Sequence, residues 1–194
     1  MNELKQKISN SNESTKTLID NSNNDNSVSN INNINNQNNL MLANYGQEDL
    51  NKIDKKLFLK AAKKGFNIPV EVTRAIHFNE DHPEYHNIFI PRINEKHAMV
   101  FKDDKWRLMN KNDLVDDLHD QKKAFIEDNY NEFYNSLDEY KKKSFERWLN
   151  ADETNPGILN TKESLKNLLY EEKDMAMDYK KECRKQQLKI NKKL

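Results

Sequence analysis

The sequence is poor in the residues on which many enzymes and secreted proteins depend. Its 194 residues include three glycines, four prolines and a single cysteine, Cys183. Three glycines are too few for a loop that cradles phosphate or a dinucleotide, because such loops need several closely spaced glycines. The lone cysteine excludes an internal disulfide and a cysteine-based zinc site within this chain, and it fits a reducing compartment.

Long apolar runs and an excess of charge of one sign are also missing. No stretch approaches the roughly 20 apolar residues of a membrane span, and the N-terminus lacks the apolar region of a signal peptide. We therefore expect a soluble, intracellular protein without a membrane partner. Lysine plus arginine equal aspartate plus glutamate, at 32 each. This balance removes the global basic excess that is typical of nucleic-acid-binding proteins.

Asparagine dominates the N-terminal part of the chain. Residues 21–40 contain 11 asparagines, and such a tract buries too little apolar surface to offset the entropy of ordering. We expect residues 1–43 to be a disordered, Asn-rich segment.

Short alternating runs occur only between residues 87 and 109. Residues 87–90, 97–101 and 105–109 read as three strands, and Asp103-Asp104 as the tip of the hairpin between the last two. Helical spacing flanks them, with predicted helices at about 47–64 and 70–76 before the strands. After them we predict a long helix capped by Asn110 and continuing to about residue 137, and a shorter helical face around Trp148.

These patterns predict an α+β fold, a small three-stranded antiparallel sheet packed by helices. The predicted domain covers residues 44–150, a linker follows at 151–160, and an amphipathic, charged C-terminal helix covers 161–194, with Asn160 and Glu163 at capping-box positions. The predicted core residues are Ile53, Leu57, Ile76, Ile88, Ile90, Met99, Phe101, Trp106, Leu114, Leu118 and Phe125.

Three histidines near the first strand, His77, His82 and His86, resemble a metal cluster at first sight. Their spacings of five and four residues, with Pro83 inside the second interval, do not match the face of a helix. A structural role is the better interpretation. We find no nucleophile motif and no paired carboxylates in a recognisable context, so we predict no catalytic, cofactor-binding or metal residues and no enzyme activity.

Aromatic residues in the strand region allow two interpretations. Tyr85, Phe89, Phe101 and Trp106 could imitate the stacking face of a nucleic-acid-binding sheet. The basic and glycine residues of the RNA-recognition sheet motif are missing, which favours core packing. Trp106 and Trp148 are both expected to be core anchors whose indole N–H needs a partner.

Charge is distributed unevenly along the chain. Residues 111–138 carry eight acidic and three basic side chains, whereas residues 180–194 carry seven basic and one acidic. The basic end can contact phosphates, bind an acidic partner, or fold back on the acidic helix of its own chain. The candidate contact residues are Lys180, Lys181, Arg184, Lys185, Lys189, Lys192 and Lys193.

Several short motifs resemble a module of uncharacterised proteins from large DNA viruses of amoebae and other protists. They are residues 45–50 (YGQEDL), 64–66 (KGF), 76–79 (IHFN), 83–90 (PEYHNIFI) and 98–101 (AMVF), followed by Lys105-Trp106; together they cover about residues 44–140. In such proteins an Asn-rich linker often follows an N-terminal zinc finger with two cysteines and two histidines. This chain has no cysteine before Cys183, so the finger is absent.

The resemblance implies a viral accessory module, in the host cytoplasm or the virion, and it supplies no catalytic residues. Two functional classes follow from the sequence. The favoured one is a non-catalytic protein-interaction or scaffold module with an unidentified protein partner. The alternative is a nucleic-acid accessory protein that uses the basic C-terminal helix. The sequence does not define the oligomeric state.

Overall fold

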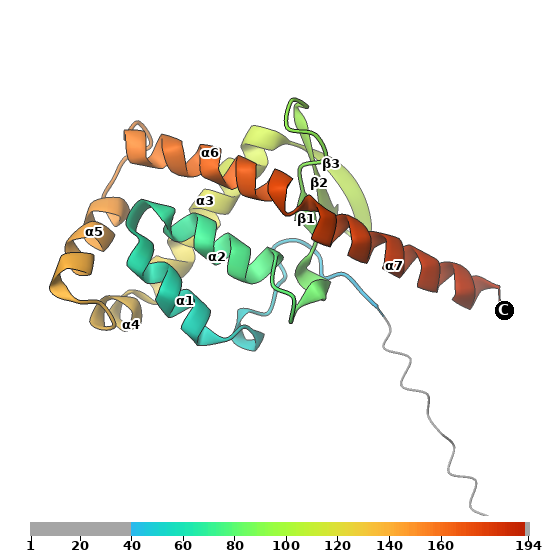
Figure 1. The fold of residues 1–194 in the computed structure, drawn as a ribbon, viewed down its shortest axis with the longest axis horizontal. Coiled ribbons are helices and arrows are strands. Elements are labelled where there is room, and N and C mark those ends of the chain that lie inside the picture. The colour runs from blue at the N-terminus through green and yellow to red at the C-terminus, as the bar shows by residue number, and fades with distance from the viewer. Residues whose placement is uncertain (1–39, 193–194) are drawn as a thin grey trace, which may run out of the picture. The chain divides into compact units, whose positions relative to one another are not determined.

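Residues 40–192 are described by the computed structural model (Figure 1). Residues 1–39, most of the segment that was expected to be disordered, lie outside this range. So does Lys193, one of the predicted contact residues. Residues 40–43, which were expected to belong to that segment, are described: Ala43 N donates a hydrogen bond to Glu84 O at 2.8 Å.

The described chain has the predicted α+β fold, with one three-stranded antiparallel sheet and helices before and after it. The helices before the sheet are η1 (Leu50–Lys52), α1 (Lys55–Ala61), η2 (Ala62–Asn67), α2 (Ile68–His77) and η3 (Pro83–Tyr85). The strands are β1 (Ile88–Phe89), β2 (His97–Lys102) and β3 (Lys105–Asn110). The helices after it are α3 (Lys111–Asp128), α4 (Tyr130–Asn135), α5 (Glu139–Leu149), α6 (Pro156–Glu171) and α7 (Lys173–Asn191).

The sheet has the order β1-β2-β3, with β2 in the middle. Asp103 and Asp104 form the predicted hairpin tip, with φ angles of 52° and 57°, as a two-residue turn between twisted strands requires. Asn44 holds this tip, because Asp104 N donates to its Oδ1 at 2.9 Å. The pairing of Val100 with Arg107 and of Phe101 with Trp106 fixes which side chains share a face.

One face of the sheet belongs to the core and the other is only partly covered. Ile88, Ala98 and Val100 are buried on the core face. Because side chains alternate along a strand and cross-strand partners share a face, the opposite face carries Phe89, Met99, Phe101, Trp106 and Leu108.

The predicted helix at 47–64 is three shorter helices. Asp49 and Asp54 each cap a new start, because their carboxylates accept from the backbone N–H two residues later, and Ile53 between them is extended. Gly65 makes a kink inside η2 with a φ of 55°, a conformation that glycine adopts without steric cost. Leu57, predicted as a core residue, is 37% exposed because this break turns it outward.

The predicted helix from residue 111 to 137 ends at residue 128. Asn110 caps it as expected, accepting from Asn112 N at 2.8 Å. Asn129 closes it, because its side-chain amide donates to Phe125 O at 2.9 Å and so competes with the helical ladder. The short α4 follows as a separate helix.

The prediction of a linker at 151–160 and one helix from 161 is wrong in its boundaries. Asn155, not Asn160, is the N-cap, and its side chain accepts from Gly157 N at 2.8 Å. Pro156 occupies the first helical turn, where its missing N–H has no cost. Glu172 separates α6 from α7.

The core consists of two clusters. One surrounds Trp148 and Phe145 among α1, α2, α4 and α5. The other lies against the sheet and includes Leu114 and Leu118 of α3 together with Leu165 and Leu169 of α6. The C-terminal segment is therefore part of the core. Of the predicted core residues, Met99, Phe101, Trp106 and Phe125 are only half-buried.

Candidate functional site

Four polar residues, Glu48, His77, Asn87 and Lys122, form one buried hydrogen-bonded chain. His77 Nδ1 lies 2.9 Å from Asn87 Oδ1, and Asn87 Nδ2 donates to Glu48 Oε1 at 2.6 Å. At the other end, Lys122 Nζ lies 3.5 Å from His77 Nε2. His77 and Asn87 are fully buried. The chain joins the segment before η1, α2, the entry to β1, and α3.

The hydrogen bonds fix the protonation state of His77. Asn87 donates its amide to Glu48, so its oxygen accepts from His77 Nδ1–H, and Nε2 accepts from the Lys122 ammonium. Burial, reinforced by the Lys122 cation, lowers the pKa of His77 to about 4. His77 Nδ1 lies 3.8 Å from Glu48 Oε1, but this contact is not an ion pair at neutral pH because the ring is uncharged. Burial also lowers the pKa of Lys122 to about 8.

The three neighbouring histidines do not converge on a common point. His77 bonds Asn87, His82 Nδ1 lies 3.3 Å from Glu84 Oε1, and His86 Nε2 donates to Asn79 O at 3.0 Å. Each has its own partner, so these contacts give them structural roles, as the spacing predicts. Sequence reasoning singled out the histidines but not their partners Glu48 and Lys122, because those come from segments far apart in the chain.

A groove between the β2–β3 hairpin and α7 combines apolar and charged residues. Its cavity volume is about 420 Å³, within the range of about 300–1,000 Å³ that is usual for binding pockets. We call it the hairpin–α7 groove. Its lining residues are Leu40, Met41, Leu42, Phe101, Asp104, Lys105, Trp106, Lys180, Cys183, Arg184 and Gln187.

Aromatic and cationic side chains meet in this groove. Trp106 packs edge-to-face against Phe89 and Phe101, with ring centroids 5.3 and 5.6 Å apart. Lys180 Nζ lies 4.7 Å from the centroid of Trp106, within cation–π distance. Burial, followed by the neighbouring Arg184 cation, lowers the pKa of Lys180. A carboxylate brought into the groove would therefore relieve repulsion between two positive charges.

The outer edge of β3 borders the same surface. Because Lys102 and Lys105 pair across a two-residue turn, Lys105, Arg107 and Met109 bond to β2. The N–H and C=O groups of Trp106 and Leu108 then point away from the sheet. Among the described residues β3 pairs only with β2. Leu108 is 68% exposed.

Lys180 and Arg184 of the predicted contact set line the groove, and Lys193 of that set lies outside the described residues. Lys181 pairs with Asp178 of the same helix at 2.8 Å. Lys185 and Lys189 of α7, and Lys192 at its C-cap, are exposed.

The basic helix does not fold back on the acidic one, which was one of the predicted options. Helix α7 packs on β1, α6 and η3. The acidic α3 instead receives a cation from α6, since Lys162 Nζ lies 2.9 Å from Asp116 Oδ1.

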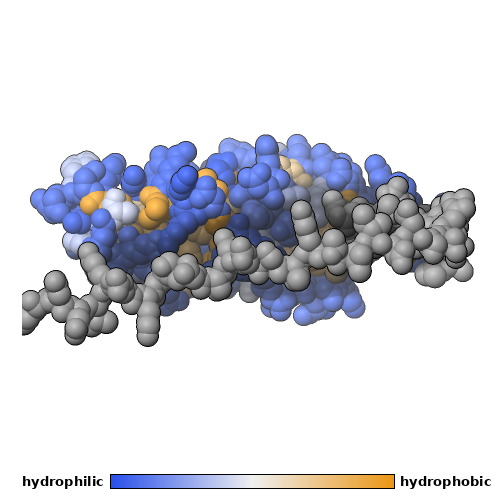
Figure 2. Space-filling model, turned by 90° about the horizontal axis from the view of Figure 1, so that it is seen from below, coloured by the Kyte–Doolittle hydropathy of each residue, from blue (hydrophilic) through white to orange (hydrophobic). Residues whose placement is uncertain are grey.

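The face of the molecule drawn in Figure 2 has no broad apolar patch among its coloured residues. The coloured atoms in Figure 2 are mostly hydrophilic, with hydrophobic residues in small separate areas.

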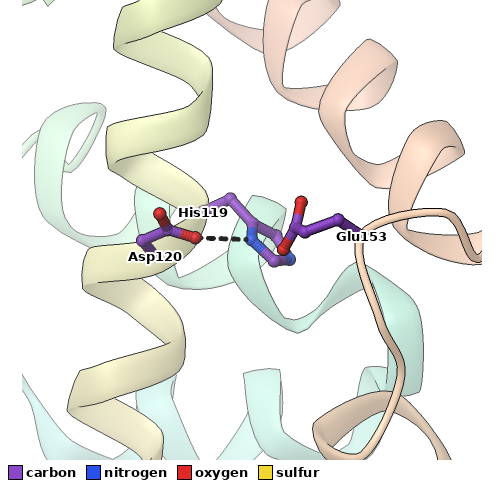
Figure 3. Close-up of side chains that lie close together, drawn as sticks. All are labelled: His119, Asp120 and Glu153. Carbon is purple, nitrogen blue, oxygen red and sulfur yellow. Dashed lines mark hydrogen bonds and ion pairs between the residues drawn. The ribbon is translucent and has the colours of Figure 1, made fainter.

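A second group of polar side chains lies where α3 meets the loop between α5 and α6. His119, Asp120 and Glu153 each place one ligand-type atom within 4.8 Å of the other two. Figure 3 shows the imidazole ring between the two carboxylates, bonded to Asp120 on one side. His119 is fully buried. Among the described residues, this group has the spacing of ligand atoms that a metal ion needs.

Comparison with known proteins leaves the chain without an assigned relative. No family model, no curated protein and no solved structure matches it. Within residues 40–192, no helix combines the length and the apolar character needed to cross a membrane.

Proposed function

We propose that this protein is a non-catalytic interaction module that binds an extended, acidic segment of a partner protein in the hairpin–α7 groove. The observation that carries the proposal is the combination of apolar walls with Lys180 and Arg184, which line the groove together with Trp106. Apolar contact supplies affinity, and the two cations select carboxylates.

The edge of β3 supports an extended ligand. The outward N–H and C=O groups of Trp106 and Leu108 can pair with a partner strand, as in β-strand addition. Side chains of that strand would alternate, so every second one would face Leu108 and Trp106. Lys105 and Arg107 make this edge basic, which disfavours pairing with a second copy of β3 and favours an acidic strand.

The buried network supports a non-catalytic role. Glu48, Asn87, His77 and Lys122 satisfy one another's hydrogen bonds inside the core. Donors and acceptors paired in this way rigidify a fold. The short motifs shared with the viral module thus have a structural explanation, and we extend the accessory role that the resemblance implies to an interaction inside the host cell or virion.

Nucleic-acid binding is the second candidate. It is favoured by the exposed Lys185, Lys189 and Lys192 on α7. It is less favoured because one face of Trp106 is occupied by Lys180, whereas base stacking needs an open aromatic face.

Selection from a displayed random-peptide library on the immobilised full-length chain tests the proposal. We expect enrichment of acidic peptides with apolar positions at alternate residues. Binding should be lost in K180E/R184E and retained in K63E/K64E, a matched charge reversal on η2. Peptides without acidic bias, or equal binding to K180E/R184E, would contradict the proposal.

The same protein should be titrated with single-stranded and duplex DNA at two salt concentrations. Phosphate binding by α7 requires an affinity that falls steeply with salt and drops in K185E/K189E/K192E. That result, without peptide enrichment, would establish the alternative instead.

A further inference from the structure

The group of His119, Asp120 and Glu153 has an unsatisfied nitrogen at its centre. His119 Nδ1 lies 3.2 Å from Asp120 Oδ1. A carboxylate only accepts hydrogen bonds, so Nδ1 carries the proton and the neutral ring keeps a lone pair on Nε2. Nε2 is buried and has no hydrogen-bond partner. Buried polar atoms of this kind are uncommon in folded proteins and call for an explanation.

The unpartnered side of the ring faces a second acceptor. In Figure 3 the Glu153 carboxylate lies beside the edge of the imidazole opposite Asp120. Two acceptors facing each other repel unless a proton or a metal ion lies between them. Glu153 does not come into hydrogen-bonding geometry with Nε2, so no described group satisfies this nitrogen.

We propose that His119 Nε2 and the Glu153 carboxylate bind a divalent transition-metal ion of the Zn²⁺ class, while Asp120 holds the ring from its other edge. Imidazole with carboxylate ligands suits Zn²⁺, whereas Mg²⁺ and Ca²⁺ prefer oxygen ligands alone. Asp120, bonded to Nδ1, orients the ring in the way that carboxylates orient metal-binding histidines. The Glu153 side chain is 61% exposed, so it has room to turn towards an ion at Nε2.

A lysine competes with the metal in this site. Lys162 Nζ lies 2.5 Å from Glu153 Oε2 and 2.9 Å from Asp116 Oδ1. A metal ion would take Glu153 from Lys162, which keeps Asp116 as its partner. The ion would then tie α3 to the loop before α6. The prediction of no metal ligands rested on spacing along the chain. Glu153 lies in a loop 34 residues after His119 of α3, and no local spacing connects the two.

Isothermal titration of the full-length, chelator-stripped protein with ZnCl₂ tests this site, with MgCl₂ as the comparison ion. The C183S/H97Q background removes the free thiol and the exposed histidine, which would otherwise offer zinc competing ligands. We expect one Zn²⁺ per chain and no saturable Mg²⁺ binding. E153Q and D120N should each weaken Zn²⁺ binding about tenfold or more, and K162M should strengthen it.

E153Q and D120N change exposed side chains, so they report on the site even where H119Q does not fold. Absence of saturable Zn²⁺ binding by the wild-type chain overturns the proposal. So does stoichiometric binding that is unchanged in E153Q and D120N.

Discussion

At the scale of single residues, burial and pairing determine what the histidines and tryptophans do. His77 is neutral because its environment is dry and lies next to the Lys122 cation. The two tryptophans were both expected to be core anchors, but their surroundings differ in the structure. Trp148 is fully buried and its indole nitrogen has no hydrogen-bond partner, contrary to expectation, whereas Trp106 is half-buried beside Lys180.

The free energy of unfolding should depend on His77 in the acidic range. Its pKa is lowered to about 4 in the folded state, so the unfolded chain binds the proton more tightly and stability falls as pH drops below about 6.5. Between about pH 7 and pH 5 this amounts to a loss of about 2 kcal/mol, while Lys122 stays mostly charged. Urea unfolding of wild type and H77Q at both pH values measures it. The gap between the two proteins should narrow at the lower pH; a constant gap would show that His77 does not titrate in this way.

The two tryptophans provide a second test at this scale. W148A should lower the free energy of unfolding by about 3–5 kcal/mol, because it removes a large side chain from a closed core. W106A should cost clearly less, since part of that ring is already in contact with water. Denaturant melts of both variants decide the matter, and equal losses would mean that Trp106 is as much a core residue as Trp148.

At the scale of elements, spacing predicted the existence and type of most helices and strands, and local chemistry decided where they end. The three strands, the hairpin tip and the Asn110 cap are confirmed because each depends on neighbouring residues. The breaks at Ile53 and Asn129 were missed, since an apolar stripe continues across a change of helix axis. The start of α6 was missed because Asn155-Pro156-Gly157 looks like a stop when it is in fact a cap and first turn.

Contacts between distant segments could not be predicted in the same way. Glu48 and Lys122 stand at the two ends of the buried network, and Glu153 lies close to His119. No local sequence pattern connects the residues of either pair. Lys180 and Arg184, which were predicted as contact residues, line the groove. Their aromatic neighbour Trp106 was assigned to the core.

Helix α6 should be indispensable for folding. Leu165, Leu168 and Leu169 fill the cluster beneath the sheet, and Thr161 Oγ1 donates to Phe66 O at 2.6 Å. A fragment of residues 44–150, the domain expected from the sequence, leaves that cluster open. We expect it to lack a cooperative unfolding transition by circular dichroism, whereas residues 40–192 should show one. A cooperative transition in the shorter fragment would show that α6 is an addition to a complete core.

At the scale of the whole molecule, a formal net charge of zero conceals two regions of opposite sign. Part of the acidic charge of α3 is neutralised internally by Lys162, and the basic charge of α7 remains at the surface beside the groove. The groove therefore presents a positive, partly apolar surface on a chain with no overall charge. This arrangement favours an acidic protein segment over indiscriminate binding to polyanions.

The most direct measurement is amide hydrogen exchange at Trp106 and Leu108, followed by NMR, with and without an acidic peptide obtained by selection on the chain. In the free protein these N–H groups face solvent at the sheet edge and should exchange quickly, whereas Arg107 and Met109, bonded to β2, should be protected. The proposal predicts that the peptide slows exchange at Trp106 and Leu108 and shifts the resonances of Lys180 and Arg184. Tight binding that leaves the exchange of both β3 amides unchanged would contradict it.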